Sequence, residues 1–158
     1  MNRNVLPVLV LLFALVSLGS CTKRERHPMA SEGLRGEAAV NLKGFHARPT
    51  PDGATVGAIF GTITAPLGDT LRAVKVAPDV AEKVEIHRIV QNAAGQMEMR
   101  PVPWLALPED EPVELKPGGL HVMLFGLAAP LQAGKTVRLT LLFQDGGERV
   151  LEVPIRDE

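Results

Sequence analysis

The sequence has few of the residue types on which many protein functions depend. Its 158 residues include one cysteine and no tyrosine, and aromatic residues make up only 4%. Because one thiol cannot form a disulfide within the chain, the fold must be stabilised by its core. With so few aromatic rings, a stacking platform for bases or sugars is not expected. The net charge of −1 provides no basic surface, so nucleic acid is not expected as a partner.

Familiar catalytic motifs are also missing. The sequence has no HExxH, no GxSxG and no glycine-rich phosphate loop before a helix. The one dense acidic run is Glu109-Asp110-Glu111. Calcium loops space their ligands along the loop, so this consecutive run predicts an exposed loop, with a hard-cation site as the weaker alternative. We therefore expect a protein that is not an enzyme.

A single long apolar run lies near the N-terminus. Residues 5–18 are continuously apolar and follow Arg3, a length that suits a signal peptide better than a membrane span. The run ends in LGSC, where the cysteine is Cys21, and this resembles the cleavage motif of bacterial lipoproteins. The resemblance implies that Cys21 carries a diacylglycerol; the alternative is an ordinary secretory signal with an incidental cysteine.

These features predict three segments. They are a lipoprotein signal peptide at 1–20, a polar and flexible lipid-anchored tether at 21–36, and a folded domain at 37–158. We therefore expect a periplasmic or otherwise extracytoplasmic monomer, held at a bacterial membrane by its acyl chains.

The domain is predicted to be all-β. Short apolar or alternating runs are separated by turn sequences such as PDG, NAAG, KPGG and DGG, and no long helical pattern occurs. A β-sandwich or barrel of about eight to nine strands follows, of the cupredoxin-like or immunoglobulin-like kind, with a short helical turn near Pro78–Glu82. The expected strands are 38–47, 55–64, 71–76, 83–90, 96–102, 113–115, 120–127, 137–143 and 149–155.

Histidines and methionines carry the remaining chemical signal. Apart from Met1, every methionine lies within two residues of a histidine or another methionine, whereas a core would scatter methionines among leucines. Residues i and i+2 of a strand point to the same face, so the members of each strand cluster lie side by side. The clusters are His27-Pro28-Met29, Met97-Glu98-Met99 and His121-Val122-Met123.

A hairpin would bring some of these side chains together. His87 lies on the more polar face of its strand, and the turn near 92–95 would place Met99 or Met97 beside it. If the strand with His121 and Met123 packs at the same end, two imidazoles and two thioethers converge. Thioethers favour copper(I), whereas a blue-copper centre would need a cysteine thiolate, and none follows Cys21. Taken alone, His121 and Met123 are explained more simply by a filled core strand.

The phrases VEIHRIVQNAAGQMEMRPV, VELKPGGLHVMLFGL and PLQAGKTVRLTLLF resemble the periplasmic copper(I) chaperone family PCuAC. The signature of that family is a histidine, about ten residues, a methionine, twenty-one residues, and then His-x-Met. Here the twenty-one residues 100–120 separate Met99 from His121, and Met123 completes the motif. The resemblance extends over about 38–155 and implies a cupredoxin-like fold.

Carried onto this sequence, the resemblance implies that the copper(I) ligands are His87, Met99, His121 and Met123. Met97 would be a neighbouring or spare thioether. The pair His27 and Met29 is either an auxiliary copper arm or an ordinary part of the tether. His46 is expected at the surface or at a sheet edge.

One feature departs from the family pattern. Eleven residues, 88–98, separate His87 from Met99 instead of ten. We expect the additional residue in the turn at 92–95, where a longer loop leaves the strands in place. A slipped register would instead move Met97 and Met99 to the opposite face.

The resemblance implies a chaperone that carries copper(I) outside the membrane and supplies the binuclear copper centre of cytochrome c oxidase by ligand exchange. The partner would be the copper subunit of the oxidase, a Sco-type thiol protein, or both, and the copper site would be exposed to them. The alternatives are copper storage or detoxification, and a metal-free, lipid-anchored interaction module.

Overall fold

The computed structural model describes residues 39–157, which belong to one compact unit. The predictions for Cys21, His27 and Met29 fall outside these residues. Two β-sheets pack against each other, and the described residues form ten strands and no helix. The predicted β-sandwich is therefore confirmed, with slightly more strands than expected. Nothing within 39–157 is a helix long and apolar enough to cross a membrane.

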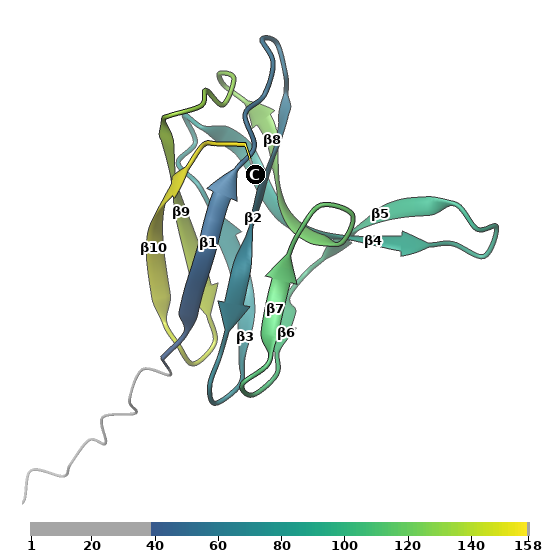
Figure 1. Ribbon diagram of the computed structural model, residues 1–158, viewed down its shortest axis with the longest axis vertical. Helices are drawn as coiled ribbons and strands as arrows, with labels where there is room; N and C mark the ends of the chain where they lie inside the picture. Colours follow the sequence, from purple (N-terminus) through teal and green to yellow (C-terminus); the bar gives the residue numbers. More distant parts are fainter. Residues whose placement is uncertain (1–38, 158) are drawn as a thin grey trace, which may run out of the picture. The chain divides into compact units, whose positions relative to one another are not determined.

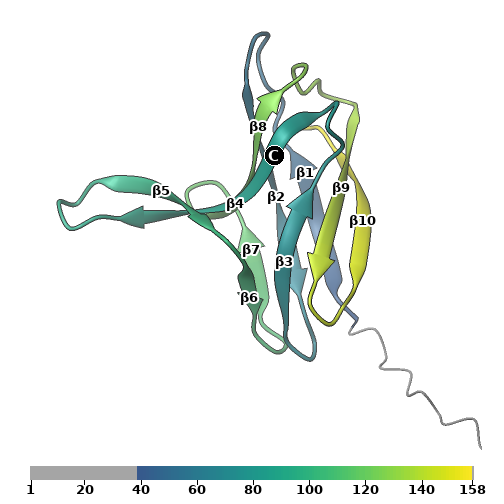
Figure 2. The same ribbon diagram turned by 180° about the vertical axis from the view of Figure 1, so that it is seen from behind.

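The larger sheet has six strands in the order β1-β2-β7-β8-β4-β5, and the smaller sheet has four in the order β10-β9-β3-β6 (Figures 1 and 2). The strands of the larger sheet are β1 (Asn41–Ala47), β2 (Val56–Thr64), β7 (Pro112–Leu115), β8 (Leu120–Leu127), β4 (Ala81–Gln91) and β5 (Met97–Val102). Those of the smaller sheet are β10 (Glu148–Pro154), β9 (Thr136–Phe143), β3 (Asp69–Lys75) and β6 (Leu105–Leu107).

Most of the predicted strands are found within a few residues of their expected bounds, and β8 has the same bounds as predicted. The missed strand is β6, whose three residues are too few to show an alternating pattern. A hydrogen-bonded turn closed by Val80 N–H and Ala77 C=O precedes β4 in place of the expected helical turn. The last two predicted strands, joined at the DGG turn, form an antiparallel hairpin, since β10 pairs with β9 along its whole length.

The core lies between the two sheets and contains alternate residues of the strands. Full burial of one Ile, Leu or Val side chain contributes about 1.5–3 kcal/mol, so these positions hold the sheets together. The largest fully buried side chains are Ile59, Ile63, Val122 and Leu124 of the larger sheet and Leu71, Leu139, Leu141 and Val153 of the smaller sheet. We call the opposite face of the larger sheet the outer face.

Strand β4 belongs partly to the sandwich and partly to a projecting hairpin. It pairs with β8 from Ala81 to Arg88 and with β5 from Ile86 to Gln91. Its second half therefore leaves the sandwich together with β5, and both ribbon views show this hairpin extending away from the two sheets (Figures 1 and 2). We call residues 89–99 the arm and the rest of the described domain the body.

Candidate metal centre

Strand β8 presents different side chains to its two faces. Val122 and Leu124 are fully buried in the core. By the alternation of a strand, His121 and Met123 lie on the outer face. Alternation along β8 thus separates two pairs of residues: Val122 and Leu124 pack in the core, whereas His121 and Met123 are buried on the outer face.

The two predicted histidines are cross-strand neighbours. His87 of β4 pairs directly with His121 of β8, and their ring centroids are 6.3 Å apart with the rings tilted by 44°. Met123 pairs with Glu85, the next outer-face residue of β4. The register therefore brings His87, His121 and Met123 together at the base of the arm.

The arm places its methionines on the same face as His87. Met99 pairs with Ile89 and Met97 with Gln91, whereas Pro101 pairs with His87. Met99 is therefore a diagonal neighbour of His87, at the distance where long side chains still meet. Met97 lies two residues further along the arm, consistent with a neighbouring thioether.

The additional residue between His87 and Met99 is absorbed by the turn. The β4–β5 pairing has no register shift from Ile86 to Gln91. Asn92 closes the turn, because its side-chain oxygen accepts hydrogen bonds from the backbone N–H groups of Ala94 and Gln96, both at 2.9 Å. The expectation of a longer loop with an unchanged register is confirmed, and Met99 stays on the face of His87.

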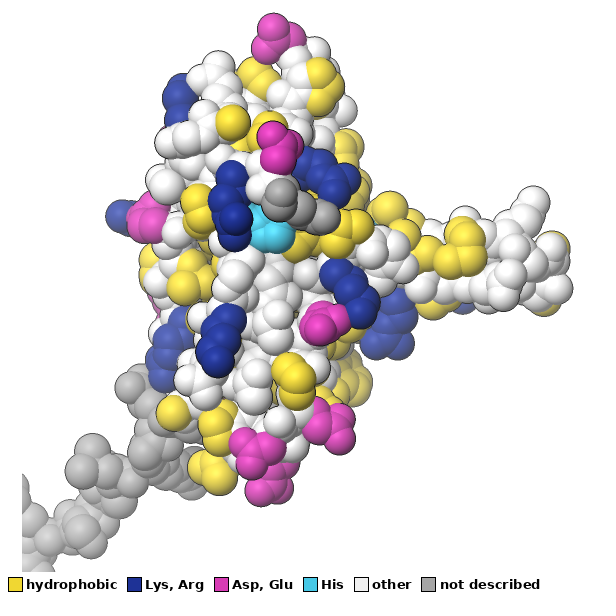
Figure 3. All heavy atoms as spheres, viewed as in Figure 1, with side chains coloured by type: hydrophobic (Ala, Val, Ile, Leu, Met, Phe, Trp, Pro, Cys, Tyr) yellow, Lys and Arg dark blue, Asp and Glu magenta, His cyan; other side chains and the backbone are white. Residues whose placement is uncertain are grey.

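Burial differs sharply within this set. His87, His121 and Met123 are 8%, 5% and 8% exposed, whereas Met99 and Met97 are 48% and 65% exposed. The expectation of an exposed site is therefore wrong for three of the four residues and correct for Met99. In the space-filling view, apolar side chains are visible along the arm, and little histidine surface is visible on that side of the molecule (Figure 3).

Two phenylalanines help to enclose the imidazoles. The ring of Phe125 lies 5.5 Å from that of His87, and the ring of Phe60 lies 6.4 Å from that of His121. The ring of His46, on edge strand β1, lies 5.6 Å from that of Phe60 and is tilted by 46°. The predicted sheet-edge position of His46 is confirmed, and the phenylalanines are contributions to the site that the sequence analysis missed.

Each imidazole uses a different ring nitrogen for its hydrogen bond. Nδ1 of His121 lies 3.0 Å from the carbonyl oxygen of Gly119, and Nε2 of His87 lies 2.9 Å from a carboxylate oxygen of Glu85. Nδ1 of His87 is buried and has no hydrogen-bond partner. A buried nitrogen without a partner is costly unless something else binds it.

Glu85 is the polar residue that the sequence analysis did not assign to the site. Its carboxylate contacts Lys83 Nζ at 2.8 Å as well as His87. The Lys83 ammonium, followed by the His87 imidazole, holds the pKa of Glu85 below its ordinary value. Its position two residues before His87 was the available signal, because strand alternation puts both side chains on one face.

The donor set is soft and neutral. Two imidazoles and up to two thioethers add no charge, which suits a monovalent soft ion such as copper(I). Within residues 39–157 no three His, Cys, Asp or Glu side chains are grouped closely enough to hold a metal. The run Glu109-Asp110-Glu111 is exposed, as expected for a loop. A site for a hard cation is therefore not supported in this part of the chain.

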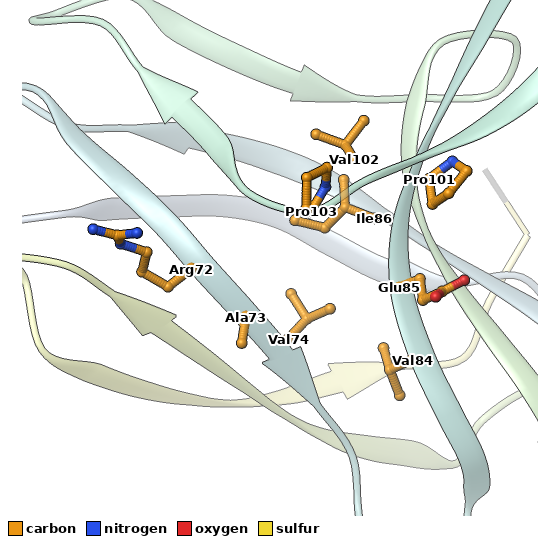
Figure 4. A pocket seen from close by; sticks show the side chains of 9 residues that line it. All are labelled: Arg72, Ala73, Val74, Val84, Glu85, Ile86, Pro101, Val102 and Pro103. Carbon is orange, nitrogen blue, oxygen red and sulfur yellow. The ribbon is translucent and has the colours of Figure 1, made fainter.

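The hollow between β3 and β4 offers no such donors. About 450 Å³ in volume, it is lined mainly by apolar side chains, with no histidine or methionine (Figure 4). In that view the Glu85 carboxylate points away from Val84 and Ile86. This orientation agrees with the placement of Glu85 on the outer face beside His87.

The family described as "Putative lipoprotein LpqE-like" matches residues 40–155, nearly the whole of the described domain. The chain belongs to the LpqE-like family. A relative from Leifsonia xyli subsp. xyli, named "Putative lipoprotein Lxx21020", is 29% identical to this LpqE-like protein over 131 residues, which cover 83% of this chain and 79% of the relative.

Solved structures of PCuAC domains share the fold of this LpqE-like protein. The apo PCuAC domain of PmoF1 superposes with a TM-score of 0.61 at 27% identity, covering 75% of this chain and 94% of that domain. The solution structure of CuI-DR1885 from Deinococcus radiodurans gives a TM-score of 0.57 at 25% identity, covering 78% and 85%. The resemblance to the PCuAC family that the sequence indicated is confirmed.

Proposed function

We propose that this LpqE-like protein is an extracytoplasmic copper(I) chaperone that binds one ion and releases it by ligand exchange. The proposed ligands are His87, Met99, His121 and Met123, with Met97 as a neighbouring thioether. The protein makes or breaks no bond in a substrate in this proposal, so copper is its cargo and the protein is not an enzyme.

The observation that carries the proposal is the direct pairing of His87 with His121, whose imidazoles share the outer face with two thioethers. Nδ1 of His87 is also buried and has no hydrogen-bond partner. Burying a polar nitrogen without a partner costs about 1–3 kcal/mol. Coordination of copper(I) by this nitrogen offsets the cost. A metal-free interaction module gives no reason to place two imidazoles and two thioethers on one face.

The comparisons support the same cargo. A structural neighbour at 25% identity, DR1885, was solved in a form named for CuI, and the neighbour from PmoF1 is named for its PCuAC domain. Both share the sandwich on which the candidate ligands are placed. The CuI form of DR1885 supports copper(I) as the bound state.

Membrane attachment and delivery extend the proposal. A diacylglycerol on Cys21 would hold the protein at a bacterial membrane, and the lipoprotein names of the family and of the Leifsonia relative support this. The receiving site would be the binuclear copper centre of cytochrome c oxidase, reached directly or through a Sco-type thiol protein. The exposed Met99 supports transfer, because an acceptor can replace that ligand first.

Copper storage or detoxification is the alternative use of the same site. Deleting the gene separates the two: delivery predicts loss of oxidase activity that added copper restores. Storage predicts greater sensitivity to copper with unchanged oxidase activity.

A copper(I) titration against a chromophoric chelator tests the binding itself. We expect one tight equivalent in the wild-type protein and loss of that binding in Met123→Ala, with a smaller loss in Met99→Ala. Leu142→Ala, at a half-buried position of β9 in the smaller sheet, is the control and should keep one equivalent. If the wild-type protein binds no copper(I), the proposed function is wrong.

A further inference from the structure

The hydrogen bonds of the two histidines select different tautomers. A neutral imidazole carries one proton, and the nitrogen that donates it to a hydrogen bond leaves the other nitrogen free to bind a metal. The nitrogen that binds copper can therefore be derived from each partner. His87 and His121 have partners at opposite ring positions.

Glu85 determines the tautomer of His87. An ionised carboxylate only accepts hydrogen bonds, so Nε2 of His87 must donate across the 2.9 Å contact. The lone pair of the neutral ring is then on Nδ1, the nitrogen that is buried without a partner. The contact with Glu85 thus selects one tautomer, and in that tautomer the nitrogen without a partner is the one that can bind a metal.

A backbone carbonyl determines the tautomer of His121. The oxygen of Gly119 can only accept, so Nδ1 of His121 donates across 3.0 Å and the lone pair is on Nε2. The same carbonyl accepts the N–H of Ile89 at 3.3 Å, which ties the position of this oxygen to the base of the arm.

Glu85 is itself held in place by its surroundings. Lys83 Nζ binds the other carboxylate oxygen at 2.8 Å and lies 5.7 Å from the centre of the Phe125 ring. That ring contacts His87 at 5.5 Å. Lys83, Glu85, His87 and Phe125 therefore form a ring of successive contacts, in which the carboxylate lies between the ammonium and the imidazole.

We propose that Glu85 is a positioning residue for the copper site. It holds His87 as the tautomer that binds copper(I) through Nδ1, whereas Gly119 holds His121 as the tautomer that binds through Nε2. This inference rests on the proposed function and deepens it, because it assigns the coordinating atoms and adds a residue outside the ligand set. Removing a carboxylate that orients a metal-binding histidine commonly lowers metal affinity about 10- to 100-fold.

Nitrogen-15 NMR of the full-length protein, in mildly alkaline buffer, tests the assignment directly. Without copper, His87 is expected to carry its proton on Nε2 and His121 on Nδ1. On addition of copper(I), the resonances expected to move most are Nδ1 of His87 and Nε2 of His121. His46, whose Nδ1 lies 2.9 Å from the Gly44 carbonyl, is an internal reference that should not move.

Three variants test the role of Glu85. Glu85→Ala is expected to weaken copper(I) binding about 10- to 100-fold and to give a mixture of His87 tautomers. Glu85→Gln keeps an oxygen that accepts the hydrogen bond, so it should restore most of the affinity. The matched control is Glu114→Ala, which removes a carboxylate that is likewise paired with a lysine two residues away, at 2.6 Å from Lys116.

The outcomes separate this inference from the proposed function. Copper(I) binding with Nε2 of His87 as the ligand, or unchanged affinity and tautomer in Glu85→Ala, overturns the role of Glu85 and leaves the chaperone proposal intact. Equal loss in Glu85→Ala and Glu85→Gln, with the His87 tautomer unchanged in both, also overturns it. Absence of copper(I) binding in the wild-type protein overturns both proposals.

Discussion

The body and the arm contribute to the candidate copper site in opposite ways. The body supplies His87, His121 and Met123 from two adjacent strands, and these side chains are buried. The arm supplies Met99 from a two-stranded hairpin that projects from the sandwich, and this side chain is half exposed. A carrier must both hold its ion and release it, and this division assigns the first task to the body and the second to the arm.

The largest expected effect concerns the stability of the body. Leu124 is fully buried on the core side of β8, and truncating such a leucine costs about 2–5 kcal/mol. Leu124→Ala should therefore lower the free energy of unfolding by that amount, measured by urea denaturation. Copper stoichiometry below the unfolding transition should stay at one; a lost equivalent would show that the two faces of β8 are not independent.

Removing a ligand of the body should have the next largest effect. His121→Ala takes away an imidazole that no neighbour can replace, so the Kd for copper(I) should rise roughly 100-fold or more, about 2.7 kcal/mol. Competition with a chromophoric chelator measures this change. His46→Ala is the control on the same face and should leave the Kd within about threefold. An equal loss of copper(I) affinity in His46→Ala would show that the site includes His46 on β1.

Removing the ligand of the arm should have a smaller effect on affinity. Met99→Leu keeps the volume but loses the thioether, and we expect the Kd to rise about tenfold, or 1.4 kcal/mol. Release of copper to the chelator should become faster in a stopped-flow measurement. Met97→Leu is the matched control and should change neither value by more than about threefold. If Met97→Leu raises the Kd more than Met99→Leu does, Met97 is the ligand and Met99 is not.

A substitution in the turn of the arm should affect the local stability of the arm more than its copper binding. Asn92 accepts two backbone hydrogen bonds and donates a third to Glu98 at 2.7 Å. Asn92→Ala should lower the local stability of the arm by about 1 kcal/mol, seen as faster amide exchange at residues 89–99 alone. Faster exchange throughout the body would contradict the independence of the two regions.

Acid should have the smallest effect, and in the arm it should act through Glu98. The Asn92 side chain, followed by Arg100, holds the pKa of Glu98 below its ordinary value. A carboxyl with a lowered pKa contributes stability above its unfolded-state pKa and loses it as the pH falls through the folded-state value. Amide exchange in the arm should therefore increase in that acidic range, and Glu98→Gln should remove this pH dependence.

Local patterns made the strands and the alternation predictable. The run LHVMLFGL is bounded by KPGG, and its alternation correctly assigned Val122 to the core and His121 to the other face. The register of the β4–β5 hairpin was also predictable, because antiparallel strands joined by a short turn can pair in few ways. A family resemblance then indicated which methionine of the arm is the proposed ligand.

The burial of the histidines and the contact between Glu85 and His87 depend on tertiary packing, which sequence patterns do not predict. The burial of His87 and His121 depends on Phe60 and Phe125, which come from separate strands and carry no pattern that links them to the histidines. The contact between Glu85 and His87 depends on side-chain rotamers and on Lys83. The small strand β6 was missed because three residues between turns give no periodicity.

The carbonyl of Gly119 has a consequence for how the two regions communicate. It accepts one hydrogen bond from the base of the arm, at Ile89, and one from the imidazole of His121. A displacement of the arm that moves this oxygen also changes the orientation of a ligand in the body. If a partner that bends the arm lowers the affinity for copper by some factor, then bound copper lowers the affinity for that partner by the same factor. Docking and release would then be a single coupled equilibrium.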